Sequence, residues 1–599
     1  MKTIKYISFV AVALCMGLFA ACTDGNDWET NGANNRVMAP RISAVTGGNG
    51  SLTVTFNTYG GNAFIIEANE SPFPVADLDG GPMEGSITAQ VSSSPGTITG
   101  LNGYTDYYVR VRAVSNSKAA SHWALYASSS IAEGQMVINQ KTAQTLGRQI
   151  LNPIADADRQ ANAIRVSWTP GEAPTSITAT YMNGEEKVVK SYSLSDADRA
   201  NAFFACNELL PSTPYTIRIY IGSECVGMQT AKTLKAPPSS DYIYTVTGTT
   251  IDQTLMNEIA ANAQAAATGE NFAATIIIPA NASVALTTGS SSVKLPANMT
   301  VYFFGAESSD GSKGTLQFDY ALDIAGYHGD ISFENLNIKC PQSSSNTYVI
   351  NQGTSASIGN ITFTSCNISD VNCAVIRTQK DEAISIGSIV MDDCIVSNQG
   401  TMEQSYGYVI TNGGSKSSII DVEITNSTFY HCVVGIVSNN TKSDYKIDNI
   451  KMSNCTIYDC IGSKSSGRYL ADAGKNSQGT LLETNMSFKN MVVGTPAHTN
   501  AKGYQTNGQL TLDHFYQTSG WKFNGGSFKS NDGGMKLDWR TGIYTDAELF
   551  EDAANFNLNL KHWFEITPAD EANGVQFDIW GDPRWRIDDG GDDGGSDDE

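Results

Sequence analysis

One short strand pattern returns in register between Gly329 and Val493, and it constrains the fold more than any other feature of the chain. In each copy a short polar residue ends one strand of alternating apolar residues, and a small or apolar residue follows it directly. The copies contain Asn335-Leu336, Ser365-Cys366, Asp393-Cys394, Asn426-Ser427, Asn454-Cys455 and Asn490-Met491. Tandem units of this kind cannot bury their apolar faces alone, and stacking them creates one continuous core. The pattern therefore predicts a solenoid of β-rungs in which polar side chains at the bend pair from rung to rung.

A second column of strands follows the first. Its strands begin at Tyr348, Ala374, Tyr408, Gly435 and Tyr469, at intervals of 26, 34, 27 and 34 residues. Rungs of unequal length have loops of unequal length on one side. A solenoid usually presents its binding face on that side.

Composition narrows the class of protein. The 599 residues include Gly 55 and only 17% charged residues, which is typical of an extracellular β-rich protein. The formal net charge of -23 argues against nucleic acid as a partner, because phosphates require a basic surface.

The N-terminus has the features of an export signal. Lys2 and Lys5 precede an apolar run over 7–18, and small residues precede Cys22. The run is too short for a membrane-spanning helix and favours a signal peptide over 1–21. It resembles a bacterial lipoprotein signal, which implies that Cys22 is lipidated; ordinary cleavage beside an incidental cysteine is the alternative. The acidic stretch after Cys22 is similar to the export tag of Bacteroidetes surface lipoproteins, which implies the outer face of the outer membrane.

Two segments share one further spacing. Leu101, Thr105 and Tyr107 recur at the offsets of Leu209, Thr213 and Tyr215, and apolar alternation follows each tyrosine. A tyrosine just after a tight corner is a device of β-sandwiches. Both segments resemble fibronectin type III domains, which serve as spacers and occasionally as ligand binders.

Beyond these modules, Ile251, Leu255 and Ile259 predict one amphipathic helix that covers the open first rung. The Gly581-Asp582-Pro583-Arg584-Trp585-Arg586 segment is expected to close the last rung. This part resembles the pectate-lyase-like right-handed parallel β-helix superfamily, and nearly the whole chain is similar to uncharacterised Bacteroidetes surface lipoproteins associated with polysaccharide utilisation. The resemblance implies a polysaccharide partner, often an acidic one such as pectin, and outer-membrane glycan-uptake proteins as further partners.

We therefore expect an all-β protein with two N-terminal fibronectin type III-like sandwiches and a right-handed parallel β-helix that has an N-terminal capping helix. The expected parts are a signal peptide (1–21), a flexible acidic linker (22–37), two modules (38–135 and 153–236), a β-helix (241–587) and a disordered acidic tail (588–599).

Cysteines recur at fixed places in the rungs. Cys366, Cys394 and Cys455 occupy one inward position, and a second group is expected to fall together after the next turn: Cys373, Cys432 and Cys460. Free cysteine packs as a small hydrophobic residue, so we expect a core ladder of thiols. Oxidation of a stacked pair to a disulfide is the alternative.

One turn could carry chemistry on an acidic glycan. Cleavage of a uronate polymer needs a base and a positive charge that stabilises the enolate. Arg377 and Lys380 are candidates for the clamp and the base, and Asp392 with Asp393 could hold Ca²⁺. The alternative is a solvated surface turn. Of the signatures of active relatives, only the Asp392-Asp393 pair has a counterpart here.

Binding requires less than catalysis. If Val349, Val375 and Val409 point inward, alternation sends their neighbouring tyrosines outward, where aromatic faces can pack on sugar rings. The candidate glycan-binding residues are Tyr348, Asn351, Arg377, Tyr408, Asn412, Asn439, Asn440, Tyr469 and Asp472. Alternatively, the tyrosines pack beneath loops and the amides cap turns. The sequence favours a glycan-binding surface lipoprotein, with a lyase or hydrolase of the same fold, or a structural or adhesive surface protein, as alternatives.

Overall fold

The computed structural model describes residues 36–76, 78–132, 135–308, 311–341, 346–462, 467–519, 528–529, 536–541, 544–561 and 580–586. The predicted signal peptide, the predicted lipidation site Cys22, nearly all of the predicted linker and the predicted acidic tail lie outside these residues. The chain divides into two units, Met1–Ala236 and Pro237–Glu599. Within the described part of the chain, no helix has the length and apolar character needed to cross a bilayer.

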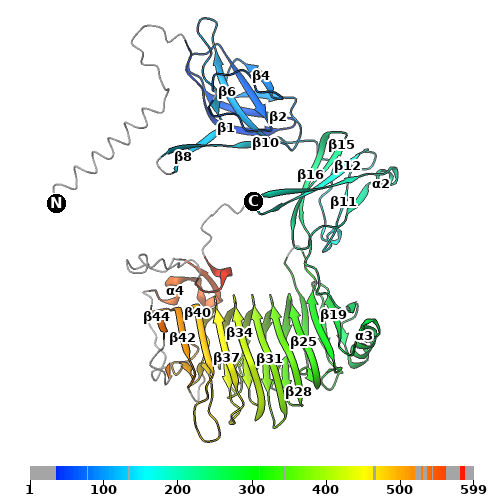
Figure 1. Cartoon of the computed structure of the whole chain (residues 1–599), viewed down its shortest axis with the longest axis vertical. Helices are drawn as coiled ribbons and strands as arrows, with labels where there is room; N and C mark the ends of the chain where they lie inside the picture. Colours follow the sequence, from blue (N-terminus) through cyan, green and yellow to red (C-terminus); the bar gives the residue numbers. More distant parts are fainter. Residues whose placement is uncertain are drawn as a thin grey trace, which may run out of the picture. The chain divides into compact units, whose positions relative to one another are not determined.

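The first module is a β-sandwich (Figure 1). One sheet contains β1 (Arg41–Gly48), β2 (Ser51–Asn57) and β5 (Gly96–Thr99). The other contains β3 (Ala63–Asn69), β4 (Ile87–Val91), β6 (Asp106–Val114), β7 (Ala124–Leu125) and β10 (Thr142–Gln144), and a separate hairpin joins β8 (Ala127–Ala132) to β9 (Gln135–Gln140). Because β10 pairs with β6, this module continues beyond the predicted boundary at residue 135.

The second module repeats the arrangement with fewer strands. Its sheets contain β11 (Ile164–Ser167) with β14 (Phe203–Cys206), and β12 (Ser176–Asn183), β13 (Glu186–Ser193), β15 (Pro214–Ile221) and β16 (Glu224–Lys232), with the short helix α2 (Asp196–Asn201). The predicted tyrosine corners are present in both modules. The hydroxyl of Tyr107 accepts a hydrogen bond from the backbone N–H of Asn102 at 3.1 Å, and Tyr215 accepts one from Leu210 at 2.8 Å. The prediction of two fibronectin type III-like modules is confirmed.

Unit 2 is a parallel β-solenoid, as predicted. It opens with β17 (Tyr242–Thr245), β18 (Thr250–Ile251), β19 (Phe272–Ile278), β20 (Ser283–Leu286), β21 (Lys294–Leu295), β22 (Met299–Gly305), β23 (Gly314–Phe318) and β24 (Asp323–Ile324). Helix α3 (Gln253–Ala266) lies where the sequence predicts a cap. Its N-cap Asp252 accepts the backbone N–H of Leu255 at 2.9 Å, and it buries Met256 and Ile259 against the core of the first rungs.

The central rungs repeat three strands each (Figure 1). The long strands are β25 (Gly326–Glu334), β28 (Ala356–Thr364), β31 (Ala383–Asp392), β34 (Lys416–Thr425), β37 (Ile447–Ser453), β40 (Asn485–Val493), β42 (Leu510–Gln517) and β44 (Lys536–Thr541). The strands after the bend are β26 (Leu336–Lys339), β29 (Asn367–Ser369), β32 (Ile395–Gln399), β35 (Thr428–Cys432) and β38 (Thr456–Tyr458). A separate seven-stranded sheet contains β27 (Ile350–Gln352), β30 (Ile376–Thr378), β33 (Ile410–Asn412), β36 (Val437–Asn439), β39 (Tyr469–Asp472), β41 (Lys502–Gln505) and β43 (Phe528–Lys529).

The bend between the first two strands explains the repeating polar residue. At this bend Asn335, Asn454 and Asn490 have φ angles of 54°, 53° and 52°, in the left-handed region that asparagine tolerates best among residues with a side chain. The side-chain amides of these residues form hydrogen bonds along the stack. Asn490 Nδ2 donates to Asn454 Oδ1 at 2.9 Å, and Asn454 Nδ2 donates to Asn426 Oδ1 at 3.0 Å. One residue type therefore satisfies the backbone angle and cross-links neighbouring rungs.

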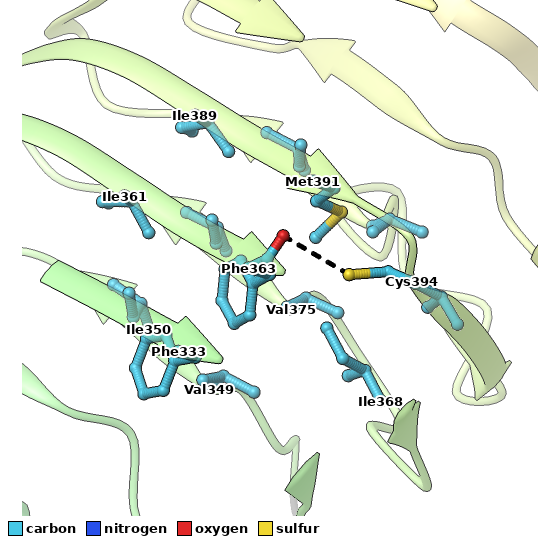
Figure 2. Close-up of a cluster of buried hydrophobic side chains, with 14 of the residues drawn as sticks. Phe333, Val349, Ile350, Ile361, Phe363, Ile368, Val375, Ile389, Met391 and Cys394 are labelled. Atoms are coloured by element: carbon cyan, nitrogen blue, oxygen red, sulfur yellow. Dashed lines mark hydrogen bonds between the residues drawn. The ribbon is translucent and has the colours of Figure 1, made fainter. Parts of the chain in front are cut away.

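The interior is a stack of matched side chains (Figure 2). The ring of Phe333 lies between Phe303 and Phe363, with centroids 5.1 and 4.8 Å away and nearly parallel planes. The thiol of Cys394 donates to the carbonyl oxygen of Phe363 at 3.4 Å. The described cysteines are free and buried, which confirms the thiol ladder for Cys366, Cys394 and Cys455.

The second cysteine group is only partly as predicted. Cys432 and Cys460 are neighbours, because the backbone N–H of Cys432 donates to the Cys460 sulfur at 3.3 Å. Cys373 lies instead in a small cluster with Tyr348 and Ala374, separate from the main core. The pairing of β29 with β32 ends at Ser369, so Cys373 lies in the loop after β29 and not in a paired strand.

The C-terminal segment 580–586, which we call the strap, is not a closing rung. The helix α4 (Asp546–Leu549) and the hairpin of β45 (Phe550–Asp552) and β46 (Asn557–Leu560) precede it. The strap lies across the bends of earlier rungs, where the N–H of Gly581 donates to the Asn490 carbonyl at 2.8 Å and Trp585 Nε1 donates to Thr428 Oγ1 at 2.6 Å. Arg584 forms an ion pair with Asp393. The prediction that this segment closes the last rung is wrong, because the strap docks on the side of the solenoid.

Candidate functional site

The seven-stranded sheet carries the candidate glycan-binding residues. Tyr348 and Tyr408 point away from the main core, as alternation predicts, but only 7% and 2% of their surface is exposed. The prediction that they offer rings to a sugar is wrong, because Tyr348 packs in a small cluster with Cys373 and Ala374 and Tyr408 packs against the following rungs. Burial raises the pKa of both phenols well above the ordinary value.

Small residues in the next rung make room for these rings. A Cβ atom on Gly435 would lie 2.4 Å from Cε1 of Tyr408, and the φ of Gly435 is +157°. The hydroxyl of Tyr408 accepts the backbone N–H of Tyr469 at 3.3 Å, one rung further. Tyr469 itself is half-buried, and the Lys502 ammonium lies 5.1 Å from its ring centroid.

Asn412 and Asn439 form an internal amide ladder. Asn412 Nδ2 donates to Asn439 Oδ1 at 2.8 Å, and Asn439 Nδ2 donates to the carbonyl of Ala473 at 3.1 Å. Thr378 Oγ1 donates to Asn412 Oδ1 at 2.7 Å. Both asparagines are fully buried, so their amides cap turns and do not face a ligand. Their assignment as glycan contacts is corrected on this ground.

Arg377 and Lys380 have different surroundings. The Arg377 guanidinium lies 3.8 Å from the ring centroid of Tyr406, and its Nη1 donates to the hydroxyl of Tyr348 at 3.1 Å. Through the cation–π contact and this hydrogen bond, Arg377 links Tyr406 to Tyr348. Lys380 is exposed, at a positive φ of 66°. The two cations do not converge on one described carboxylate or hydroxyl.

The two candidate calcium ligands have protein partners. Asp392 Oδ1 accepts hydrogen bonds from Thr425 and from Asn426 Nδ2, the latter at 2.9 Å. Asp393 accepts from Ser365 Oγ at 2.7 Å and pairs with Arg584 of the strap. The described residues contain no group of three or more His, Cys, Asp or Glu side chains placed for a metal. Asp392 therefore stabilises the bend through hydrogen bonds, and Asp393 holds the strap through its ion pair. The arrangement of the two carboxylates does not resemble a Ca²⁺ site.

Two clefts open beside the seven-stranded sheet. The first cleft, of about 370 Å³, is lined by Asp319, Asp323, Thr347, Asn351, Gln379 and Lys380 among others. It brings together three predicted residues, Tyr348, Asn351 and Lys380. The Oδ1 atom of Asn351 is buried and has no hydrogen-bond partner among the described residues.

The second cleft, of about 400 Å³, lies toward the later rungs. Among its lining residues are Asn440, Lys442, Arg468, Asp472, Asn476 and Gln505. Predicted residues from successive rungs meet here, because Asn440 follows β36 and Asp472 ends β39. Tyr408 and Asn439 form part of its buried base.

Charges at the second cleft are arranged around one carboxyl group. Asp472 accepts the backbone N–H of Gly474 at 2.8 Å and Gln505 Nε2 at 2.9 Å. Burial raises the pKa of Asp472, while these bonds and the nearby Arg468 oppose the rise. The Nε of Arg468 is buried without a partner among the described residues, and Lys442 and Lys475 are exposed on the rim. Three cations therefore line this cleft together with the carboxyl group of Asp472, in a protein of net charge -23.

Sequence reasoning missed Arg468, Lys442 and Lys475. They lie on the loops of unequal length, outside both repeating columns, so no register marks them. The only available signal was their position beside the predicted binding face, within ten residues of a candidate strand end.

No protein-family model and no curated protein matches the sequence. Among solved structures, the chain is similar to a segment of two fibronectin type III domains from chicken tenascin, with 16% identity, 33% of this chain and 99% of that chain covered, and a TM-score of 0.16. It is also similar to the FN1–FN3 domains of chicken CNTN1, with 17% identity, 33% and 68% covered, and a TM-score of 0.12. The assignment of the two modules in this chain depends on their strand order and tyrosine corners.

Proposed function

We propose that this protein binds an acidic polysaccharide in the second cleft. The observation that carries the proposal is the convergence of Arg468, Lys442 and Lys475 with the amides of Asn440, Asn476 and Gln505 around one groove. Amides satisfy sugar hydroxyls, and a guanidinium pairs with a carboxylate through two parallel hydrogen bonds. The Nε of Arg468 is buried and has no hydrogen-bond partner among the described residues, so it is a donor that such a carboxylate would satisfy.

The rest of the chain supports a role at the cell surface. The lipoprotein-like leader would anchor the protein through Cys22 to the outer membrane, and the two sandwich modules would hold the solenoid away from it. We propose on this basis a surface lipoprotein of a polysaccharide-utilisation system, which would pass glycan to outer-membrane uptake proteins.

Affinity electrophoresis tests the proposal. The full chain is run in native gels that contain polygalacturonate or chondroitin sulfate, and retardation is compared with a gel that lacks polymer. Arg468→Ala is expected to weaken binding about tenfold to a hundredfold, because a charge-assisted hydrogen bond contributes about 1.5–3 kcal/mol. Arg41→Ala, which removes an exposed arginine of β1, is the matched control and should leave retardation unchanged. Equal retardation of both variants would refute the assignment of the second cleft.

The alternatives have their own readouts. A lyase would release unsaturated uronate ends that absorb in the ultraviolet, and a calcium-dependent signal abolished by Arg377→Ala would favour it. Among the described residues, the one feature that favours a lyase is the position of Lys380 in the first cleft. If no acidic or neutral glycan retards the full chain, the remaining class is a structural or adhesive surface protein.

A further inference from the structure

A row of hydroxyl groups crosses the outer face of the long strands. Tyr327, Ser357, Ser385 and Ser418 occupy facing positions on β25, β28, β31 and β34. Their neighbours on both sides along β28 and β31 are buried, so the pleat directs this row outward. Ser385 Oγ donates to Ser357 Oγ at 3.2 Å, which leaves further lone pairs and donors of the row facing solvent.

The three serines of this row lie in a concave surface of about 460 Å³ that also includes Gly326, Lys416 and Tyr445, and Tyr327 lies beside it, next to Gly326. We call it the tyrosine trough. Tyr445 precedes β37, whose Ile447 faces Ile419 of β34, so it belongs to the rung after Ser418. Tyr327 and Tyr445 are each 49% exposed and belong to the first and the last of these rungs. Four rung spacings separate them, or roughly 19 Å at the usual distance between strands.

The charge of the trough differs from that of the second cleft. Lys416 is the one charged residue that lines it within the described part of the chain, and its Nζ pairs with Asp381 at 3.2 Å. Asp381 also accepts a hydrogen bond from Ser415. The trough therefore offers hydroxyls and aromatic faces, with its cation already neutralised.

A single exposed tyrosine on a protein surface needs no explanation. Here one half-exposed ring lines the concave surface, a second lies beside it on the first rung, and the serine hydroxyls between them repeat at the strand spacing. An aromatic ring packs on the apolar face of a sugar, and hydroxyls exchange hydrogen bonds with the sugar's edge. A repeating polymer laid along the solenoid axis would meet one hydroxyl of the row at each rung.

We propose that the tyrosine trough is a second glycan-binding site, which takes an uncharged, extended polysaccharide across the rungs from β25 to β37. The inference rests on the proposed function in so far as the protein meets polysaccharide. It adds a site on another face, with a different class of ligand from the acidic polymer of the second cleft.

The test uses the full chain with Tyr327→Ala and Tyr445→Ala combined. Native gels contain hydroxyethylcellulose, galactomannan or soluble starch. At least one of these neutral polymers is expected to retard the unaltered chain. The double variant should bind it about fivefold to 150-fold more weakly, because each of the two aromatic contacts contributes about 0.5–1.5 kcal/mol. Tyr59→Ala, which removes a 42% exposed tyrosine of the first module, is the matched control and should bind normally.

Arg468→Ala separates this inference from the proposed function. It should weaken retardation by polygalacturonate and leave retardation by the neutral polymer unchanged, while the tyrosine double variant should do the reverse. Retardation by no neutral polymer, or an equal effect of the double variant and Tyr59→Ala, overturns the trough as a site. Neither result affects the test of the second cleft, which depends only on retardation by polygalacturonate.

Discussion

The carboxyl group of Asp582 in the strap gives the protein a predictable pH dependence. It is buried against the bends of the solenoid, where Oδ2 accepts Thr428 Oγ1 at 2.6 Å and Oδ1 accepts the backbone N–H of Arg584 at 3.1 Å. Burial raises the pKa of Asp582 from 3.8 to about 6, although the Arg584 cation opposes the rise. We therefore predict that Asp582→Asn stabilises the folded chain at neutral pH.

The magnitude follows from the shift. The folded state holds the Asp582 proton more tightly than the unfolded chain, so the associated stability is complete below about pH 4 and is lost as pH rises through about 6. A shift of about two units at about 1.4 kcal/mol per unit corresponds to roughly 3 kcal/mol. Asparagine keeps an oxygen for the Arg584 N–H, presents a donor to the Thr428 oxygen as the protonated carboxyl group would, and carries no charge to desolvate.

The assay compares guanidinium unfolding of the unaltered chain and Asp582→Asn at pH 4.0, 5.0, 6.0 and 7.5. The two free energies of unfolding should agree within about 1 kcal/mol at the lowest pH, and the variant should be more stable by about 3 kcal/mol at the highest. Asp448→Asn, at an exposed position of β37, is the control and should show no such divergence. Parallel curves for Asp582→Asn over the whole range would refute the argument that the strap buries this carboxyl group.

Other substitutions test the fold, each by the free energy of unfolding. Phe333→Ala empties the middle of the ring stack and should cost about 3–5 kcal/mol; a loss below 1 kcal/mol would contradict that stack. Asn454→Ala removes ladder bonds and places alanine at positive φ, for an expected loss of about 2–3 kcal/mol, against almost none if the amides bonded only to water. Tyr215→Phe should destabilise the second module by about 1 kcal/mol, and an unchanged melting temperature would argue against the corner bond. Glu67→Gln leaves Arg110 buried beside a neutral partner and should cost about 3–5 kcal/mol at low and high salt alike, whereas a salt-sensitive loss would indicate an exposed pair.

The fold was predictable because its signals are local and repeated. Asparagine at the bend meets a backbone angle that few residues tolerate, and the residue after it enters the core by simple alternation. Each further copy repeats the same pair of bend residue and inward residue, so the sequence predicts the register of the rungs. The tyrosine corners are equally local, since Tyr107 and Tyr215 each bond to a backbone group five residues away.

The candidate site was predicted less well. Alternation correctly directs Tyr348 and Tyr408 away from the core, yet whether an outward ring meets water depends on how the loops over it fold. The trough was missed for a related reason. Tyr327 and Tyr445 come from unlike places in their rungs, and only the stacking of the rungs places both of them near the same serines, four rung spacings apart.

The sequence by itself determined the solenoid, its bends, its thiol column and the two sandwich modules, since each depends on contacts between residues close in the chain or one repeat apart. The tertiary structure alone decided which polar residues face solvent and where the strap docks. Arg584 reaches Asp393 across 191 residues of sequence, and Arg468 joins Lys442 and Asn440 from separate loops. No repeating pattern predicts these contacts, because they depend on the paths of loops that differ from one rung to the next.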